Sequence, residues 1–306
     1  MKLIIGTRNS KLAMWQAEYV SDKLKEAGAE VELIPIKTKG DKILDVSISK
    51  IGSKGVFTEE LDEMLKNGTI DIAVHSAKDI QSSLDQGFEL LAFTEREKSH
   101  DVILSDKPFS LSEGMTLGTS STRRIALINH FYPNCKTVPV RGNLQTRIKK
   151  MQDGHCDALM LAYAGVARMG YADMIRHEFD LQELIPPVGQ GCIAIEGYHS
   201  LDDKKKTFIK TTLNHRDTEV CIRAERAFLK TLDGGCSIPV YGNAVLEKEA
   251  IVLTGGICSL DGVKLLTKTL RGTIQNPEEL GKTLGDQILR EGGKEILNQI
   301  KQTLNQ

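Results

Sequence analysis

The feature that most constrains the fold of this chain is a strand, a glycine turn and a helix that occur in the same order twice. Residues 3–5 form a short apolar run, a turn over residues 6–10 comes next, and residues 11–27 have the spacing of an amphipathic helix. A turn of similar sequence, Gly118-Thr119-Ser120-Ser121, comes after Leu117 and opens a second helical run. Strands that alternate with helices in this way predict an α/β architecture with parallel sheets.

The two halves differ in length, and the difference predicts an insertion in the first one. Gly6 and Gly68 are 62 residues apart, whereas the corresponding Gly118 and Gly154 are 36 apart. Most of the extra length falls in a polar, lysine-containing segment without periodicity, which predicts a lid loop over about residues 42–57. We therefore predict two similar lobes. The alternative, that turns of this kind recur by chance in α/β proteins, stays open.

A break at Pro186-Pro187 marks the end of the second lobe. The apolar run at residues 193–195 is predicted to return to the sheet of the first lobe, because a lone strand needs a sheet to join. From about residue 217 the pattern changes to a helix, a glycine turn, strands near 240–247, 250–257 and 263–271, and helices near 277–304. We predict a first lobe over residues 1–95 and 190–216, a second lobe over 96–189, and a smaller C-terminal α+β domain over 217–306.

Composition argues against several classes of protein. The 306 residues carry 40 basic and 41 acidic side chains, so the net charge of −1 indicates no particular partner. The six cysteines include no C-x-x-C pair, which argues against zinc and disulfide frameworks and favours a reducing compartment. The sequence has no signal-peptide pattern and no run long enough to span a membrane, so we expect a soluble cytoplasmic protein. Without a long exposed apolar stripe, a monomer is the default expectation.

Positive charge is concentrated in one segment. Residues 114–152 contain no aspartate or glutamate, but they contain Arg123, Arg124, Lys136, Arg141, Arg147, Lys149 and Lys150. The first two arginines fall in the first turn of a predicted helix, where the helix dipole disfavours cations unless an anion binds. Because loops at the carboxyl ends of parallel strands face one crevice, we expect an anion-binding cleft there. The alternative for each arginine alone is a solvated surface charge.

Asp79 is the carboxylate expected to open into this cleft, because it comes after an apolar strand predicted at residues 70–74. A carboxylate in a cationic setting would repel an acidic ligand, so a cationic or N–H group is its expected target. It would then stabilise developing positive charge or move a proton. The alternative is a helix N-cap, which aspartate often provides after a strand.

Cys236 lies in the turn Asp233-Gly234-Gly235-Cys236, between a helical run and an apolar strand. The two glycines end the helix and allow a tight turn, which would place the thiol at an exposed loop tip. A thiol in such a position is suited to carry a covalent group. The alternative is a small buried hydrophobe, as most single cysteines are.

Taken together, these residues resemble the hydroxymethylbilane synthase family, also called porphobilinogen deaminase. The matching motifs are G-T-R-x-S-x-L-A at residues 6–13, V-H-S-x-K-D at 74–79, G-T-S-S-x-R-R at 118–124, R-G-N at 141–143, V-G-Q-G at 188–191, A-E-R-A-F at 224–228 and G-G-C at 234–236. They run in family order through all three predicted units. Each motif is weak alone, whereas the set is specific.

The resemblance implies two lobes like those of type II periplasmic binding proteins, a third domain, and a transferase. The reaction condenses four porphobilinogen molecules head to tail with loss of ammonia, and hydrolysis then releases the linear tetrapyrrole hydroxymethylbilane. The growing chain starts from a dipyrromethane cofactor, and Cys236 matches the cysteine that holds this cofactor through a thioether. The resemblance also implies hand-off of the product to uroporphyrinogen-III synthase.

The resemblance further implies roles for individual residues. Asp79 matches the catalytic aspartate, which is thought to contact pyrrole N–H groups and to stabilise a cationic azafulvene-type intermediate. The matches to cofactor-binding positions, besides Cys236, are Lys78, Ser120, Arg123, Arg124 and Gly142. The matches to substrate-binding positions are Arg8, Ser10, Lys54, Arg141, Arg147, Arg168 and Gln190.

Some positions depart from the family pattern. Glu59 stands where many relatives have a lysine, so one contact between the lid and a substrate acid is in doubt. Ala77 replaces a common methionine, Ile80 and Gln81 replace a hydrophobic-proline pair, and Thr122 replaces a leucine. These changes alter the shape behind the catalytic position and leave its chemistry intact.

Two other functions stay open on the sequence alone. A two-lobed binding or sensor protein for an anionic ligand would use the same arginines but would need neither Cys236 nor Asp79. Nucleic-acid binding through residues 114–152 is disfavoured, because only 5% of the residues are aromatic and the arginines stand at turns rather than along one helix face.

Overall fold

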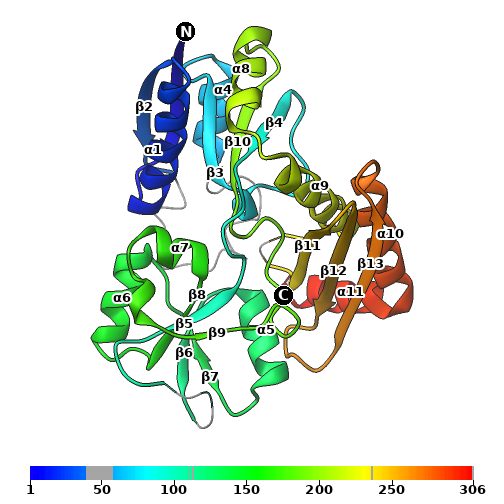
Figure 1. The fold of residues 1–306 in the computed structure, drawn as a ribbon. Helices are drawn as coiled ribbons and strands as arrows, with labels where there is room; N and C mark the ends of the chain where they lie inside the picture. The colour runs from blue at the N-terminus through cyan, green and yellow to red at the C-terminus, as the bar shows by residue number, and fades with distance from the viewer. Residues whose placement is uncertain (39–57, 110, 112–113, 236, 305–306) are drawn as a thin grey trace.

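The computed structural model describes residues 1–38, 58–109, 111, 114–235 and 237–304 (Figure 1). Lys54, Cys236 and the predicted lid loop at 42–57 lie outside the described residues. The described part of the chain is organised by two sheets of five strands and one of three. Figure 1 shows the first lobe at the top, the second at the lower left and the C-terminal domain at the right.

The first lobe is a five-stranded sheet in the order β2-β1-β3-β10-β4. Its elements are β1 (Lys2–Arg8), α1 (Lys11–Glu26), β2 (Glu30–Ile36), α4 (Glu59–Lys66), β3 (Ile72–Ser76), β4 (Phe88–Phe93), β10 (Ile193–Tyr198) and α8 (Asp203–Leu213). The Ser10 hydroxyl caps α1 by accepting the Ala13 N–H at 3.3 Å. The helix buries Ala17, Val20 and Leu24 against the sheet, and this spacing is the apolar stripe that predicted the helix.

The second lobe is a five-stranded sheet in the order β7-β6-β8-β5-β9. Its elements are β5 (Asp101–Leu104), β6 (Thr116–Gly118), α5 (Thr122–Phe131), β7 (Lys136–Val138), α6 (Leu144–Gln152), β8 (Ala158–Ala162), α7 (Tyr163–Arg168), a 3-10 turn, η2 (Ala172–Met174), and β9 (Ile175–Glu178). The strands pack through a buried core that includes Ile103, Leu117 and Met160.

The two lobes share one topology. In the first sheet β1 lies between β2 and β3, and in the second β6 lies between β7 and β8. The next strand in each sheet runs antiparallel to its neighbour: β10 to β3, and β5 to β8. The prediction of two similar lobes is therefore confirmed. The predicted parallel pairing is present in three strands of each sheet. Each sheet is nevertheless mixed, because its antiparallel strand, β5 or β10, enters on a segment that crosses over from the other lobe.

The C-terminal domain packs helices on a three-stranded antiparallel sheet. Its elements are α9 (Arg216–Thr231), β11 (Val240–Glu247), β12 (Ala250–Cys258), β13 (Leu265–Thr273), α10 (Pro277–Ile288), a π-helical turn, η3 (Leu289–Gly293), and α11 (Lys294–Leu304). The helices α9 and α10 pack closely at Gly281, where an added Cβ would lie 2.1 Å from the Ala224 carbonyl oxygen. Phe228 and Leu284 fill the core beneath them. The predicted α+β character is confirmed.

Two connections, residues 94–100 and 186–192, join the lobes, and the C-terminal domain contacts both lobes (Figure 1). Ile222 of α9 packs with Ala77 and Phe93 near the first lobe, and Tyr241 of β11 packs with Ile185 in the core of the second. On these contacts we propose the domain division given above: residues 1–95 with 190–216, 96–189, and 217–306. Among the described residues, no helix combines the length and the apolar character required to cross a membrane.

A buried ion pair holds the three units together. Glu225 of α9 has no exposed surface and pairs with Arg96 of the first connection, with 2.5 Å between Oε1 and Nη1. Its carboxylate also accepts the N–H of Gly189 in the second connection at 2.8 Å and the N–H of Ala244 in β11 at 2.7 Å. One carboxylate therefore links both connections to the C-terminal domain.

Candidate active site

Asp79 lies just beyond the end of β3, in a 3-10 turn, η1 (Ala77–Asp79). Its side chain is exposed, and among the described residues it has neither a hydrogen bond nor an ion pair. Asp79 ends this turn rather than capping a helix, so the N-cap alternative is wrong. The carboxylate is free to meet a group that arrives from solution.

The side chain of Lys78 turns toward the second lobe. Its ammonium donates to Oε1 of Gln190 at 3.2 Å. Burial, followed by repulsion from Arg124, lowers the pKa of Lys78 to about 8, although Asp79 and Asp101 partly offset this effect. An anion beside this amine would raise its pKa again and favour the charged form.

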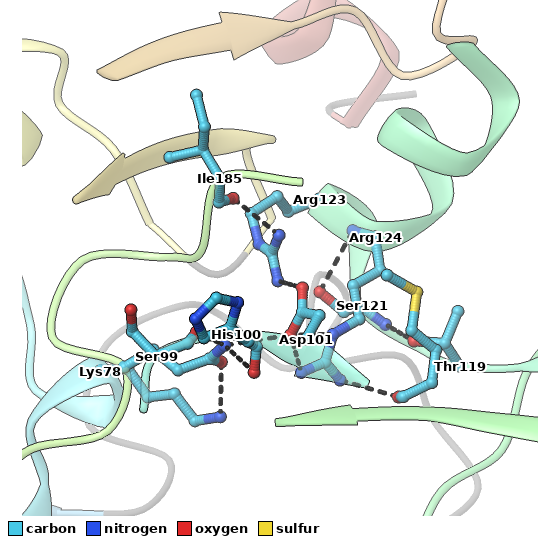
Figure 2. Close-up of polar contacts among 11 residues, drawn as sticks. Lys78, Ser99, His100, Asp101, Thr119, Ser121, Arg123, Arg124 and Ile185 are labelled. Carbon is cyan, nitrogen blue, oxygen red and sulfur yellow. Dashed lines mark hydrogen bonds and ion pairs between the residues drawn. The ribbon is translucent and has the colours of Figure 1, made fainter. Parts of the chain in front are cut away.

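Arg123 and Arg124, at the start of α5, point into the second lobe and hold Asp101, as Figure 2 shows. Asp101 Oδ2 lies 2.5 Å from Nη2 of Arg123, and Oδ1 accepts from Nε and Nη2 of Arg124 at 3.1 and 2.7 Å. The two guanidinium groups also donate to the Ile185 and Met160 carbonyl oxygens. Burial raises the pKa of Asp101, but the two guanidinium groups outweigh it and hold this pKa well below its usual range.

The expected anion at the start of α5 is therefore already part of the protein. Arg123 and Arg124 are 4% and 6% exposed, whereas the neighbouring Ser120 is exposed. Sequence reasoning missed Asp101, which opens a fully buried strand. A charged residue directly before an apolar run, in a chain with an arginine pair nearby, is the signal that could have indicated it.

A second basic group lies at the start of α6. Asn143 caps this helix by accepting the Thr146 N–H at 2.9 Å, and Gly142 has a φ of +117°, a conformation that favours glycine. Arg147 donates from Nε to the Gly142 carbonyl oxygen at 2.7 Å. Burial, then repulsion from Arg124 and Arg141, lowers the pKa of Arg147 to about 10, while Asp79 opposes the decrease. Asp79 of one lobe and Arg147 of the other thus belong to one electrostatic group.

Three further predicted residues, Arg8, Ser10 and Arg168, lie directly before α1 or at the end of α7. Arg8 ends β1 and is partly buried, and Ser10 is engaged as the cap of α1. Arg168 of α7 donates to the Gly191 carbonyl oxygen at 2.8 Å, and its guanidinium lies 5.4 Å from the centre of the Trp15 ring. This arginine therefore spans from the second lobe to the first.

Gln190 has no exposed surface. Its carboxamide contacts Lys78, the Ser99 carbonyl oxygen and Asp101. Gln190 therefore contacts the charged residues Lys78 and Asp101 from the protein interior, without reaching the surface.

We call Lys78, Arg123, Arg124, Arg141 and Arg147 the interlobe cationic cluster. Its charges act on one another and on two carboxylates, Asp79 and Asp101. Nε of Arg123 is buried and has no hydrogen-bond partner in the part of the chain that the structure describes. A ligand that carries several carboxylates fits this concentration of basic side chains.

Comparison with known proteins points to one family over nearly the whole chain. The family model described as "Porphobilinogen deaminase, dipyromethane cofactor binding domain" matches residues 3–206, and "Porphobilinogen deaminase, C-terminal domain" matches residues 219–290.

Full-length relatives give the same result. The porphobilinogen deaminase of Cytophaga hutchinsonii is 54% identical over 304 residues, which cover 98% of this chain and 97% of the relative. That of Desulfosudis oleivorans is 51% identical over 305 residues and 98% of each chain, and that of Desulfitobacterium hafniense is 47% identical over the same shares.

Proposed function

The chain belongs to the porphobilinogen deaminase family, and we propose that the interlobe cationic cluster with Asp79 is the site of its reaction. The family joins four porphobilinogen molecules head to tail on a dipyrromethane primer, with loss of ammonia, and releases hydroxymethylbilane by hydrolysis. The chain therefore functions in tetrapyrrole biosynthesis. We assign the enzyme to the transferases, because each step moves the pyrrolylmethyl group of one porphobilinogen from its leaving ammonia to the free end of the enzyme-bound chain.

The described residues fit the acidic cofactor of the family. We assign its carboxylates to Lys78, Arg123, Arg124, Ser120 and the backbone at Gly142. The assignment is supported by the electrostatic proximity of Lys78 to Arg123 and Arg124. When bound, the group supplies a covalently held pyrrole to which substrate units are added, so that an unfinished product stays on the enzyme. Cys236, which lies outside the described residues, remains the predicted attachment site.

Asp79 is proposed as the catalytic residue. Its carboxylate is exposed while Asp101, the other acid of the group, is buried and neutralised by arginines. Loss of ammonia from porphobilinogen leaves positive charge on the substrate, and a fixed carboxylate stabilises such charge where it develops. The same oxygen atoms can accept pyrrole N–H groups and orient the ring.

The substrate carboxylates are assigned to four arginines, one serine and one lysine. We propose Arg8, Ser10, Arg141, Arg147 and Arg168 for this role, together with Lys54, which the structure does not describe. Arg147 provides the clearest support. Burial and neighbouring cations lower its pKa to about 10, and an anion bound beside it would offset this destabilisation of the charged guanidinium.

The single observation that carries the proposal is the exposed carboxylate of Asp79, which interacts electrostatically with the cations Lys78 and Arg147. The first test is the intact mass of the denatured protein with mapping of the modified peptide. An excess of two linked pyrroles on the peptide with Cys236 is expected. A protein that stays unmodified after incubation with porphobilinogen would instead favour the two-lobed binding protein.

The second test is Asp79→Asn. Because Asp79 is exposed and its side chain makes no hydrogen bond or ion pair within the described residues, we expect normal folding and at least an approximately 100-fold loss of porphobilinogen consumption. Glu95, an exposed acid outside the cluster, gives the control variant Glu95→Gln, which should keep full activity. Wild-type turnover in Asp79→Asn would overturn the assigned role.

From family membership we also propose a cytoplasmic monomer that passes its product to uroporphyrinogen-III synthase. Light scattering of the purified protein tests the monomer, and coupled assays with and without the synthase test the transfer. A stable dimer in solution would overturn the first of these proposals.

A further inference from the structure

We propose that Gln190 is a positioning residue that aims the Lys78 ammonium at the reaction site and ties this lysine to the charges of the second lobe. The inference rests on the proposed function only in taking Lys78 as a group that binds carboxylates of the pyrroles. It replaces the role that the resemblance assigns to Gln190, since a side chain without exposed surface cannot contact substrate.

The carboxamide of Gln190 has one orientation that satisfies its neighbours. Its oxygen accepts from Lys78 Nζ at 3.2 Å, and its nitrogen donates to the Ser99 carbonyl oxygen at 2.6 Å and to Asp101 Oδ1 at 3.0 Å. The reversed orientation would place N–H donors against an ammonium group and an oxygen against two acceptors. Gln190 therefore presents its acceptor to the first lobe and its donors to the second.

Lys78 depends on this contact for its direction. In the described ranges, Gln190 Oε1 is the one hydrogen-bond acceptor of the ammonium, while Arg123 and Arg124 repel it and Asp79 and Asp101 attract it. A lysine side chain is flexible and has three N–H donors. One donor is fixed by Gln190, which leaves two for an anionic ligand.

Gln190 is itself held from both sides. Its carbonyl oxygen accepts from Nε of Arg96 at 2.8 Å, and its N–H donates to the Pro187 carbonyl oxygen at 3.1 Å. The preceding Gly189 has a φ of +78° and donates to Glu225 at 2.8 Å. The carboxamide thus sits on a fixed backbone and can orient a mobile neighbour.

The test compares two variants that should move Lys78 in opposite directions. Gln190→Glu places a negative charge beside the ammonium and should raise the pKa of Lys78 by about 1 unit or more, whereas Gln190→Met removes the acceptor and should lower it. The titration is followed by NMR of ¹³C-methylated lysines in the holo-protein, with Lys78→Arg to assign the signal. Gln182 is exposed, so Gln182→Met is the matched control and should shift nothing.

Steady-state kinetics provide the functional readout. Gln190→Met should lose about tenfold or more in kcat/KM, because a misdirected cation binds the ligand in the wrong geometry. Shifts of Lys78 in the same direction in both Gln190 variants, or none relative to Gln182→Met, would overturn the inference. If a variant fails to fold, the wild-type protein provides the test. Its Gln190 carboxamide resonances must shift as Lys78 titrates, and resonances that stay constant would overturn the inference.

The outcomes separate this inference from the proposed function. If wild-type protein consumes porphobilinogen but Lys78 titrates identically in all variants, the function stands and the role of Gln190 is wrong. If the pKa of Lys78 shifts as expected in the variants but wild-type protein never consumes porphobilinogen, the positioning role of Gln190 stands and the proposed function is wrong.

Discussion

Replacing Glu225 with glutamine should loosen the junction of all three units. Glu225 is fully buried. Its carboxylate pairs with the Arg96 guanidinium and accepts hydrogen bonds from the N–H groups of Gly189 and Ala244. Glutamine has a similar volume and keeps an oxygen for one N–H group. It leaves the Arg96 guanidinium, 13% exposed, without its counter-charge.

The structure sets the size of the effect. Removing one partner of a buried ion pair costs about 3–5 kcal/mol, because the remaining charge stays in a medium that solvates it poorly. Since glutamine retains part of the hydrogen bonding, we expect the lower end, about 3 kcal/mol. An exposed pair between α9 and α10, Arg223 with Glu278, is the matched control, and Glu278→Gln should cost less than about 1 kcal/mol.

Urea unfolding followed by far-UV circular dichroism and by tryptophan fluorescence is the suitable assay. A second variant, Arg96→Met with Glu225→Gln, removes the uncompensated charge and should be more stable than Glu225→Gln alone. The reasoning is refuted if Glu225→Gln costs no more than the exposed control, or if the double variant is less stable than the single one.

Three further predictions concern stability and backbone. Burial, with the charge of Glu196, raises the pKa of Asp62 to about 6, so this acid destabilises the fold above pH 6 and loses that effect as pH falls toward 4. Asp62→Asn should therefore raise the free energy of unfolding by about 1–2 kcal/mol at pH 8. Denaturant unfolding of the variant and the wild type, at pH 8 and below pH 5, should show that this difference shrinks at the lower pH; a constant difference would contradict the prediction. Gly189→Ala should cost about 1–3 kcal/mol and reduce turnover, because the new Cβ would lie 2.9 Å from the Ala77 carbonyl carbon at a positive φ; unchanged melting and kinetics would argue against it. Ser10→Ala should cost about 1 kcal/mol through loss of the α1 cap, whereas Ser10→Asp should retain it, and thermal melting separates the two.

Local patterns predicted most of the fold, because the stripe on α1 and the apolar run at β3 each depend on a few neighbouring residues. The position of Asp79 at the end of its strand came from the same reasoning. Strand direction could not be predicted in this way, since the antiparallel entry of β5 and β10 depends on how the chain crosses between lobes.

The chemistry of the site was predicted less completely. Arg123 and Arg124 were recognised as basic residues at a helix start, but their partner Asp101 is more than 20 residues away and is chosen by tertiary packing. Gln190 was singled out by its motif, but a motif gives no side-chain direction. These assignments needed the three-dimensional contacts.

The discontinuity of the first lobe has a consequence for the order of events at the ribosome. β10 lies between β3 and β4, yet it is synthesised about 100 residues after them, when the whole second lobe has already been made. The segment 96–189 holds every strand of its own sheet and can close as soon as it emerges. The amino-terminal lobe, although translated first, must wait with β4 detached from β3. We therefore expect the middle of the sequence to fold before its beginning, and a nascent chain halted before residue 193 should protect the second sheet and leave the first incomplete.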